Sequence, residues 1–198
     1  MKEEEKNMEN LALKQEKYTY EDLQNIENKK RYELIDGELY LMSSPSTSHQ
    51  EIVGEIYAQL HNYLKGKKCK AFVSPLDVCL SGLRNPKKEY NVVQPDILVV
   101  CDNTKITNNM GIQGAPDLII EVLSPASKKH DTLVKYNLYQ YYGVKEYWIV
   151  DEEIGVIYQY IINEKNIYTL PKTYEITEDI KVNILENCII SLKEILKK

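Results

Sequence analysis

The chain has 198 residues, of which 43% are hydrophobic and 28% are charged, with 25 basic residues against 30 acidic ones. This length and apolar content predict one compact domain and exclude a mainly disordered chain. No apolar run approaches the roughly 18 residues of a membrane span, and the charged segment Met1–Lys6 lacks the apolar core of a signal peptide. We therefore expect a soluble cytoplasmic protein without membrane contacts. The net charge of −5 argues mildly against a nucleic-acid partner.

The predicted elements begin after a charged leader, residues 1–17, which is rich in lysine and glutamate. Residues 18–198 then form a single predicted domain. Its first helix starts at a capping-box pattern, Thr19 to Asp22, and reaches about Ile26. The N-terminal part of the domain therefore opens on a short, well-capped helix.

A hairpin and a long helix follow. Asp36-Gly37 favours positive φ angles, which predicts a tight turn between two strands within residues 31–42. From about Ser48 to Lys65 apolar residues recur every four positions, which predicts an amphipathic helix on a core. The mixed order of elements predicts an α/β domain. The remaining predicted elements are strands at 69–74, 77–80, 97–101 and 118–123, a helix at 128–142 ended by Gly143, strands at 146–150 and 154–162, and a closing helix from Ser191.

The four cysteines are widely spaced, and no two of them form a CxxC pair: they are Cys69, Cys79, Cys101 and Cys188. Zinc sites and disulfide-rich scaffolds have characteristic short spacings that this chain lacks. The sequence therefore predicts neither a zinc site nor a disulfide framework.

Two acidic residues accompany the two most apolar strand segments. Glu121 interrupts the run 118–123, where a lone buried carboxylate costs free energy unless it is paired, protonated or bound to a metal. Asp96 immediately precedes the run 97–101. If the two runs pair as a hairpin centred near residues 108 and 109, Asp96 lies opposite Glu121, with Cβ atoms about 5 Å apart. Two carboxylates so placed favour a hard divalent cation such as Mg²⁺, whereas a one-residue slip would put them on opposite faces.

A lysine on the following helix is the third candidate. Lys135 follows Asp131 by four residues, so the two side chains share one face of the helix. In one interpretation they form an ordinary surface ion pair. In the other, Lys135 points back at the strand end, where an ammonium could steady an attacking water and the charge that develops on a phosphate. Spacing alone leaves both interpretations open.

At this point the sequence resembles the putative restriction endonuclease family of the PD-(D/E)XK nuclease superfamily. The resemblance covers roughly residues 18–195 and implies a restriction-endonuclease-like fold, a mixed central β-sheet flanked by helices. The segments that carry it are Arg31–Glu38, Ser43–His49, Gln94-Pro95-Asp96, Glu121–Pro125, Asp131–Lys135 and Tyr142–Asp151.

The resemblance also implies Mg²⁺-dependent hydrolysis of DNA phosphodiester bonds, with Mn²⁺ as a substitute ion. Asp96 and Glu121 would hold the metal, which lowers the pKa of bound water and neutralises the scissile phosphate. The superfamily pattern has a lysine two residues after the second acid, and this chain has Leu123 there. Lys135 would then replace that lysine, and a solvent-facing Lys135 would put catalysis in doubt.

Two further residues match the same family pattern. Glu33 is either an additional acid of the site or a surface glutamate paired with Arg31 or Lys30. His49 either reaches the metal-bound water or a phosphate, or is a polar residue at the start of its helix. Both pairs of interpretations stay open at the level of sequence.

Three classes of function remain in competition. The leading hypothesis is a metal-dependent DNA endonuclease, for which cutting both strands suggests a homodimer. The second is a catalytically inactive module on the same fold that binds nucleic acid or another protein. A glycosidase that uses the two carboxylates is a third reading, in which Lys135 has no natural part. The cleavage specificity, the natural substrate and the biological context stay undetermined.

The net charge also conceals an uneven distribution. Between His61 and Tyr90 the chain has seven basic residues and two acidic ones, which predicts a phosphate-facing segment despite the acidic total. The candidate DNA contacts in it are Lys67, Lys68, Lys70, Arg84, Lys87 and Lys88.

Overall fold

The computed structural model describes residues 17–27, 30–125 and 127–193. The predicted leader, residues 1–17, therefore lies outside the described part of the chain except for Lys17. Within the described part, no helix is both long and apolar enough to cross a membrane.

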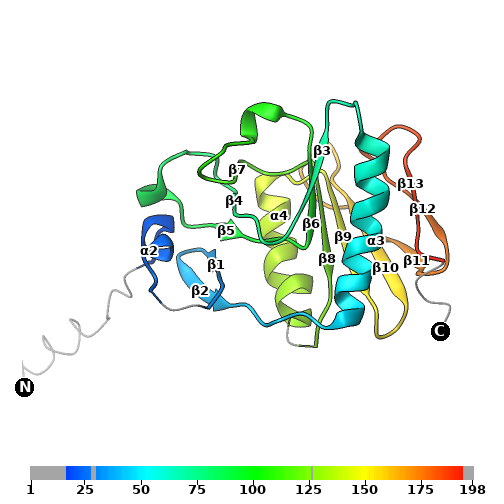
Figure 1. The fold of residues 1–198 in the computed structure, drawn as a ribbon, viewed down its shortest axis with the longest axis horizontal. Coiled ribbons are helices and arrows are strands. Elements are labelled where there is room, and N and C mark those ends of the chain that lie inside the picture. The colour runs from blue at the N-terminus through cyan, green and yellow to red at the C-terminus, as the bar shows by residue number, and fades with distance from the viewer. Residues whose placement is uncertain (1–16, 28–29, 126, 194–198) are drawn as a thin grey trace, which may run out of the picture.

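A mixed six-stranded sheet forms the centre of the molecule (Figure 1). Its strands lie in the order β11-β10-β9-β8-β6-β3, and only β8 and β9 run parallel to each other. The parallel pair is connected through the helical segment η3–α4, as parallel pairing requires a crossover. The bounds are β3 (Lys70–Val73), β6 (Ile97–Val100), β8 (Leu118–Val122), β9 (Glu146–Asp151), β10 (Val156–Ile161), β11 (Lys172–Glu175), α3 (Thr47–Leu64), η3 (His130–Lys135) and α4 (Tyr136–Tyr142).

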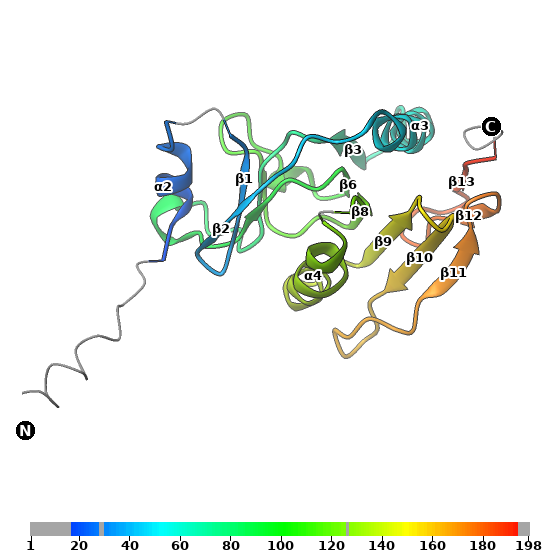
Figure 2. The ribbon, with the colours of Figure 1, turned by 90° about the horizontal axis from the view of Figure 1, so that it is seen from below.

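Helices cover both faces of this sheet. Figure 2 shows α3 above the strands and α4 below them. Alternate residues of β6 accordingly belong to different cores: Ile97 and Val99 pack with α3, whereas Leu98 and Val100 pack with α4. Every residue of β6, β8 and β9 is buried, which explains their continuous apolar sequences.

A smaller five-stranded sheet packs on the α4 side and contains the predicted hairpin. Asp36 and Gly37 have φ angles of 51° and 82°, as the Asp-Gly turn requires. Its strand order is β2-β1-β5-β4-β7, and the short helix α2 lies against it with the predicted capping box at Thr19 and Asp22. The bounds are α2 (Tyr20–Gln24), β1 (Tyr32–Ile35), β2 (Glu38–Leu41), β4 (Val78–Cys79), β5 (Val92–Val93) and β7 (Ile112–Gln113).

The prediction of a closing helix from Ser191 is wrong for the described residues. Ser191 ends a strand, because its backbone N–H and C=O both bond the side chain of Gln59 on α3, at 2.9 and 2.6 Å. This tertiary contact holds the segment extended, and residues 194–198 lie outside the described part. The remaining elements are η1 (Pro86–Lys88), η2 (Asn103–Lys105) and the hairpin of β12 (Asp179–Lys181) and β13 (Ile189–Ser191).

The structure also corrects the reading of the cysteines. Cys69 and Cys101 form a disulfide, although they are 32 residues apart in sequence. The antiparallel register of β3 and β6 pairs Lys70 with Val100, so the next residues along, the two cysteines, lie opposite each other. Strand pairing creates this proximity, and no local spacing signals it. Cys79 and Cys188 are free and buried.

A buried carboxylate ties the C-terminal segment to the sheet. Glu146 is fully buried at the start of β9 and accepts hydrogen bonds from Trp148 Nε1 at 2.7 Å and Gln159 Nε2 at 2.6 Å. The backbone N–H groups of Asn183 and Ile184 also donate to it, at 3.1 and 2.9 Å. Four donors thus depend on one side chain.

Glu146→Ala is expected to lower the free energy of unfolding by about 3 kcal/mol or more, because it leaves buried donors without an acceptor. Urea unfolding followed by circular dichroism measures this change. Glu175→Ala, on the exposed surface of β11, is the matched control and should stay within about 0.5 kcal/mol of the parent chain. Equal stabilities of the two variants would contradict the assignment.

Candidate active site

The pairing of β6 and β8 brings the two predicted acids together. Ile97 pairs with Ile120 and Leu98 with Ile119, so that Asp96 lies opposite Glu121 one residue further on. This is the register that the sequence predicts. The Asp96 backbone N–H donates to Glu121 Oε2 at 3.3 Å, which joins the two residues at the end of the sheet.

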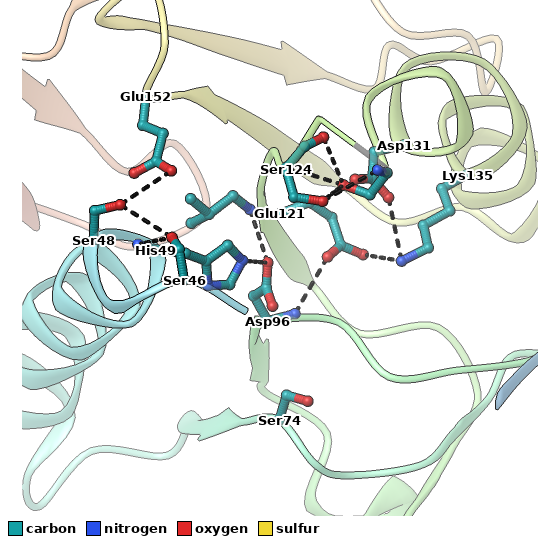
Figure 3. A network of polar contacts seen from close by, with 12 residues as sticks. Ser46, Ser48, His49, Ser74, Asp96, Glu121, Ser124, Asp131, Lys135 and Glu152 are labelled. Carbon is teal, nitrogen blue, oxygen red and sulfur yellow. Dashed lines mark hydrogen bonds and ion pairs between the residues drawn. The ribbon is translucent and has the colours of Figure 1, made fainter. Parts of the chain in front are cut away.

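Lys135 reaches the same place from the helix (Figure 3). Its Nζ lies 3.0 Å from Glu121 Oε1, 2.9 Å from Glu33 Oε1 and 3.3 Å from Asp131 Oδ1. Its side chain is only 5% exposed, so the surface-pair interpretation is wrong even though the contact with Asp131 exists. Lys135 closes a π-helical segment, η3, which is a geometry often found at functional sites.

Glu33 enters the cluster from the hairpin. It is 3% exposed on β1 and accepts a hydrogen bond from the Gln94 backbone N–H at 2.9 Å. His130 Nε2 lies 3.6 Å from its other carboxylate oxygen. The interpretation of Glu33 as a surface glutamate is therefore wrong, because its side chain is buried against Lys135.

His49 lies on the other side of Asp96. It is in the first turn of α3, where its backbone N–H bonds the N-cap residue Ser46 at 3.0 Å. Its ring Nε2 lies 3.1 Å from Asp96 Oδ2, which also accepts from the Val122 backbone N–H at 2.9 Å. Both sequence interpretations of His49 thus apply at once: it is part of the helix start and it contacts the site.

Sequence reasoning missed two neighbours of the cluster. The Tyr139 hydroxyl donates to Glu121 Oε1 at 2.8 Å. A usable signal existed, because Asp131, Lys135 and Tyr139 recur every four residues along one helix face. His130, which has no partner motif in the sequence, packs on the ring of Tyr40 with centroids 4.5 Å apart.

Charges in this buried cluster are unequally favoured. Burial raises the pKa of Glu121 well above its usual range, an effect that Lys135 opposes and that the neighbouring carboxylates reinforce. Burial also acts on Glu33, but Lys135, His130 and the Gln94 N–H together lower the pKa of Glu33 to about 2. For Lys135 the surrounding carboxylates outweigh burial and raise its pKa well above the usual range. Lys135 is therefore a permanent cation in this arrangement, and the carboxylates around it titrate as a unit.

A pocket of about 460 Å³ opens over these side chains. Lys135 and Glu121 line it together with Asp96 and His49. Further around its wall are Arg31, Gln94 and Ser74. The site is thus open to a ligand while its charged groups are held by the fold.

The donor set fits a hard cation held partly by non-protein ligands. Among the described residues, no three His, Cys, Asp or Glu side chains are grouped to hold a metal by themselves. Asp96 and Glu121 supply two adjacent carboxylates at the pocket. Mg²⁺ is commonly bound by one or two carboxylates plus waters and substrate phosphates, whereas zinc requires three or four protein ligands. The residues present therefore fit Mg²⁺ or Mn²⁺.

The predicted basic contacts do not gather at this pocket, and none of the six lines it. Lys67 and Lys68 follow the far end of α3, whose 18 residues span about 27 Å from the turn that holds His49 (Figure 1). Arg84 donates to the Thr104 carbonyl at 2.6 Å, and Lys87 lies 3.6 Å from Glu21. Their contact with DNA stays a prediction.

Comparison with known proteins supports the fold. The Uma2 family model, described as putative restriction endonuclease, matches residues 18–192. An uncharacterized protein of Synechocystis sp. (strain ATCC 27184 / PCC 6803 / Kazusa) is 30% identical over 111 residues, or 56% of this chain and 55% of that protein. The chain thus spans about half the length of that curated relative.

A solved structure has the same architecture. The crystal structure of a putative nuclease belonging to DUF820 from Anabaena variabilis ATCC 29413 superposes with a TM-score of 0.67 at 19% sequence identity. The match covers 89% of this chain and 96% of that one. The expected restriction-endonuclease-like α/β fold is thereby confirmed.

Replacing Glu33 should change how stability depends on pH. The folded-state pKa of about 2 lies below the ordinary 4.5, so its ionisation stabilises the fold fully above pH 4.5. That contribution is lost as the pH falls toward 2. We expect Glu33→Gln to cost about 2 kcal/mol at pH 7 and progressively less between pH 4.5 and 2.

Urea unfolding at a series of pH values measures this difference. Glu38→Gln, on the exposed strand β2 of the same hairpin, is the control and should show no such pH-dependent gap. A gap that stays constant with pH would contradict an ionised, paired Glu33.

Proposed function

This chain belongs to the Uma2 family of putative restriction endonucleases, and we propose that it is a metal-dependent endonuclease that hydrolyses the phosphodiester bonds of DNA. One observation carries the proposal: the buried ammonium of Lys135 lies 3.0 Å from Glu121, which is paired in register with Asp96 at an open pocket. Two carboxylates and a cation at one point match the needs of phosphoryl chemistry.

Asp96 and Glu121 are the proposed ligands of Mg²⁺, with Mn²⁺ as a substitute. A bound ion would lower the pKa of a water and neutralise charge on the scissile phosphate. The chain orients both carboxylates in advance. Asp96 is held by His49 and the Val122 N–H, and Glu121 by Tyr139 and Lys135. Such fixed orientation reduces the reorganisation needed when substrate binds.

Lys135 takes the place of the lysine that the superfamily pattern has two residues after the second acid. Leu123 occupies that position here and is buried in the core on the α4 side. The ammonium instead enters from η3, one helical element later in the chain. Because its pKa is raised, Lys135 does not act as a general base. We assign it the stabilisation of negative charge on the phosphate and the orientation of the attacking water.

Glu33 and Asp131 have a supporting part in this proposal. Both contact Lys135, and their carboxylates hold the ammonium beside Glu121. His49 positions Asp96 from the α3 side. The glycosidase hypothesis has no use for a lysine salt-bridged to one of its two acids. DNA is accordingly the proposed partner, and a homodimer stays a prediction.

Removing one proposed metal ligand tests the mechanism. Asp96→Asn is expected to lower Mg²⁺- or Mn²⁺-dependent nicking of supercoiled plasmid DNA by at least roughly 100-fold, because a carboxylate ligand is lost. Asp179→Asn, at an exposed ion pair with Lys193, is the control and should nick like the parent chain. Full activity of Asp96→Asn would overturn the mechanism. A parent chain that folds and binds DNA but never nicks it would point to the inactive module.

Lys135→Gln tests the cation separately. We expect at least roughly a 100-fold slower nicking rate, with Mn²⁺ binding retained in calorimetry, because the amide keeps hydrogen-bonding capacity but loses the charge. Lys145→Gln removes the same charge from a pair with Asp117 outside the pocket and serves as the control. Circular dichroism checks folding, and equal rates for the two variants would exclude a catalytic role for Lys135.

A further inference from the structure

An arginine at the wall of the pocket has no part in the mechanism above. The chain has only two arginines, Arg31 and Arg84, among its 25 basic residues. Arg31 immediately precedes β1 and lines the pocket. It lies two residues before Glu33, so both side chains project from the same face of the extended chain. One strand thus sends a carboxylate to Lys135 and a guanidinium to the pocket wall.

Neutral groups hold this guanidinium. Arg31 Nε and Nη2 donate to Gln94 Oε1 at 3.1 and 2.7 Å, and Nη2 also donates to Ser74 Oγ at 2.7 Å. Among the described residues no carboxylate forms an ion pair with it, in contrast to Lys128 and Lys145. The guanidinium is therefore fixed in position while its charge is not neutralised, and within the described residues its Nη1 has no hydrogen-bond acceptor.

The acceptor is itself held in place. Gln94 Nε2 donates to Asp77 Oδ1 at 2.8 Å, and the Tyr20 hydroxyl donates to Asp77 Oδ2 at 2.7 Å. Tyr20 is 2% exposed in the core of the smaller sheet. A chain of hydrogen bonds thus extends from that core to Arg31. Such pre-organisation lowers the entropic cost of binding an anion.

The second anchor places Arg31 next to the proposed metal site. Val73 pairs with Ile97, and the Ser74 N–H bonds the Asp96 carbonyl at 3.1 Å, so Ser74 lies directly opposite Asp96 (Figure 3). Opposed residues have Cβ atoms about 5 Å apart. Successive phosphates of one strand advance about 3.4 Å along the duplex axis. The guanidinium is therefore within reach of a phosphate one or two nucleotides from the one at Asp96.

We propose that Arg31, positioned by Gln94 and Ser74, binds a DNA backbone phosphate beside the scissile one. This inference rests on the proposed function and adds a phosphate subsite to it. A guanidinium presents paired N–H donors that match phosphate oxygens, which the compact ammonium of lysine does not. The contact is to the backbone, so it contributes affinity and register without reading sequence.

Salt-dependent DNA binding tests the subsite. The full chain is titrated with a fluorescent duplex in EDTA, which prevents cleavage, at several NaCl concentrations. Arg31→Gln is expected to weaken binding about 10-fold and to reduce the slope of log K against log salt by about 1. Arg31→Lys should restore the slope but only part of the affinity, because it keeps the charge and loses the paired donors.

Lys172→Gln, on the exposed edge strand β11, removes one positive charge away from the pocket and is the matched control. If Arg31→Gln binds DNA with the same affinity and slope as this control, the subsite is refuted. Loss of folding is excluded by circular dichroism, and Arg31→Lys tests the same contact independently.

Nicking kinetics separate this inference from the proposed function. Arg31→Gln should raise KM about 10-fold with kcat nearly unchanged, since the contact forms equally in substrate and transition state. Nicking by the parent chain with unchanged DNA binding by Arg31→Gln would refute the subsite and leave the nuclease proposal intact. Arg31-dependent DNA binding without nicking would refute the nuclease proposal and support the subsite. A parent chain that does not bind DNA refutes both.

Discussion

The buried ammonium of Lys135 is the interaction on which the rest of this structure depends. Burying a charge costs several kcal/mol unless it is paired with good geometry. Its three carboxylate partners come from three separate elements: Glu33 from β1, Glu121 from β8 and Asp131 from η3. Each element must dock correctly for the charge to be satisfied, so the cluster couples the smaller sheet, the main sheet and the helix. Without the ammonium, the same carboxylates would repel one another.

The same constraint shapes the pocket. β8 is buried along its whole length, and Glu121 is the one charged residue within it. Its placement at the sheet edge lets one carboxylate satisfy both the buried Lys135 and the exposed end, where Asp96 follows. Arg31 and Lys135 then lie on opposite approaches to these acids, one tethered by neutral groups and the other fully paired. A cation free to bind an anion and a cation held by the fold thereby serve different purposes within 460 Å³.

Much of the architecture follows from local pattern. The apolar runs that became β6 and β8 and the turn at Asp36-Gly37 are each encoded within a few residues. The register of Asp96 and Glu121 follows as well, because the two strands are antiparallel neighbours in the chain. The two-residue strands β5 and β7 are too short for any periodicity. The disulfide and the extended conformation at Ser191 arise from contacts between segments distant in sequence.

By itself, the sequence determined which carboxylates are candidates, because Asp96 and Glu121 stand out against apolar strands whose burial the composition already demands. Only the tertiary structure decided where Lys135 points, since the rotation of a helix over a sheet is set by core packing rather than by spacing along the chain. It likewise buried Glu33 and directed Arg31 to the pocket. A count of basic residues along the chain predicts local charge, but distance through space decides which charges can act on one substrate.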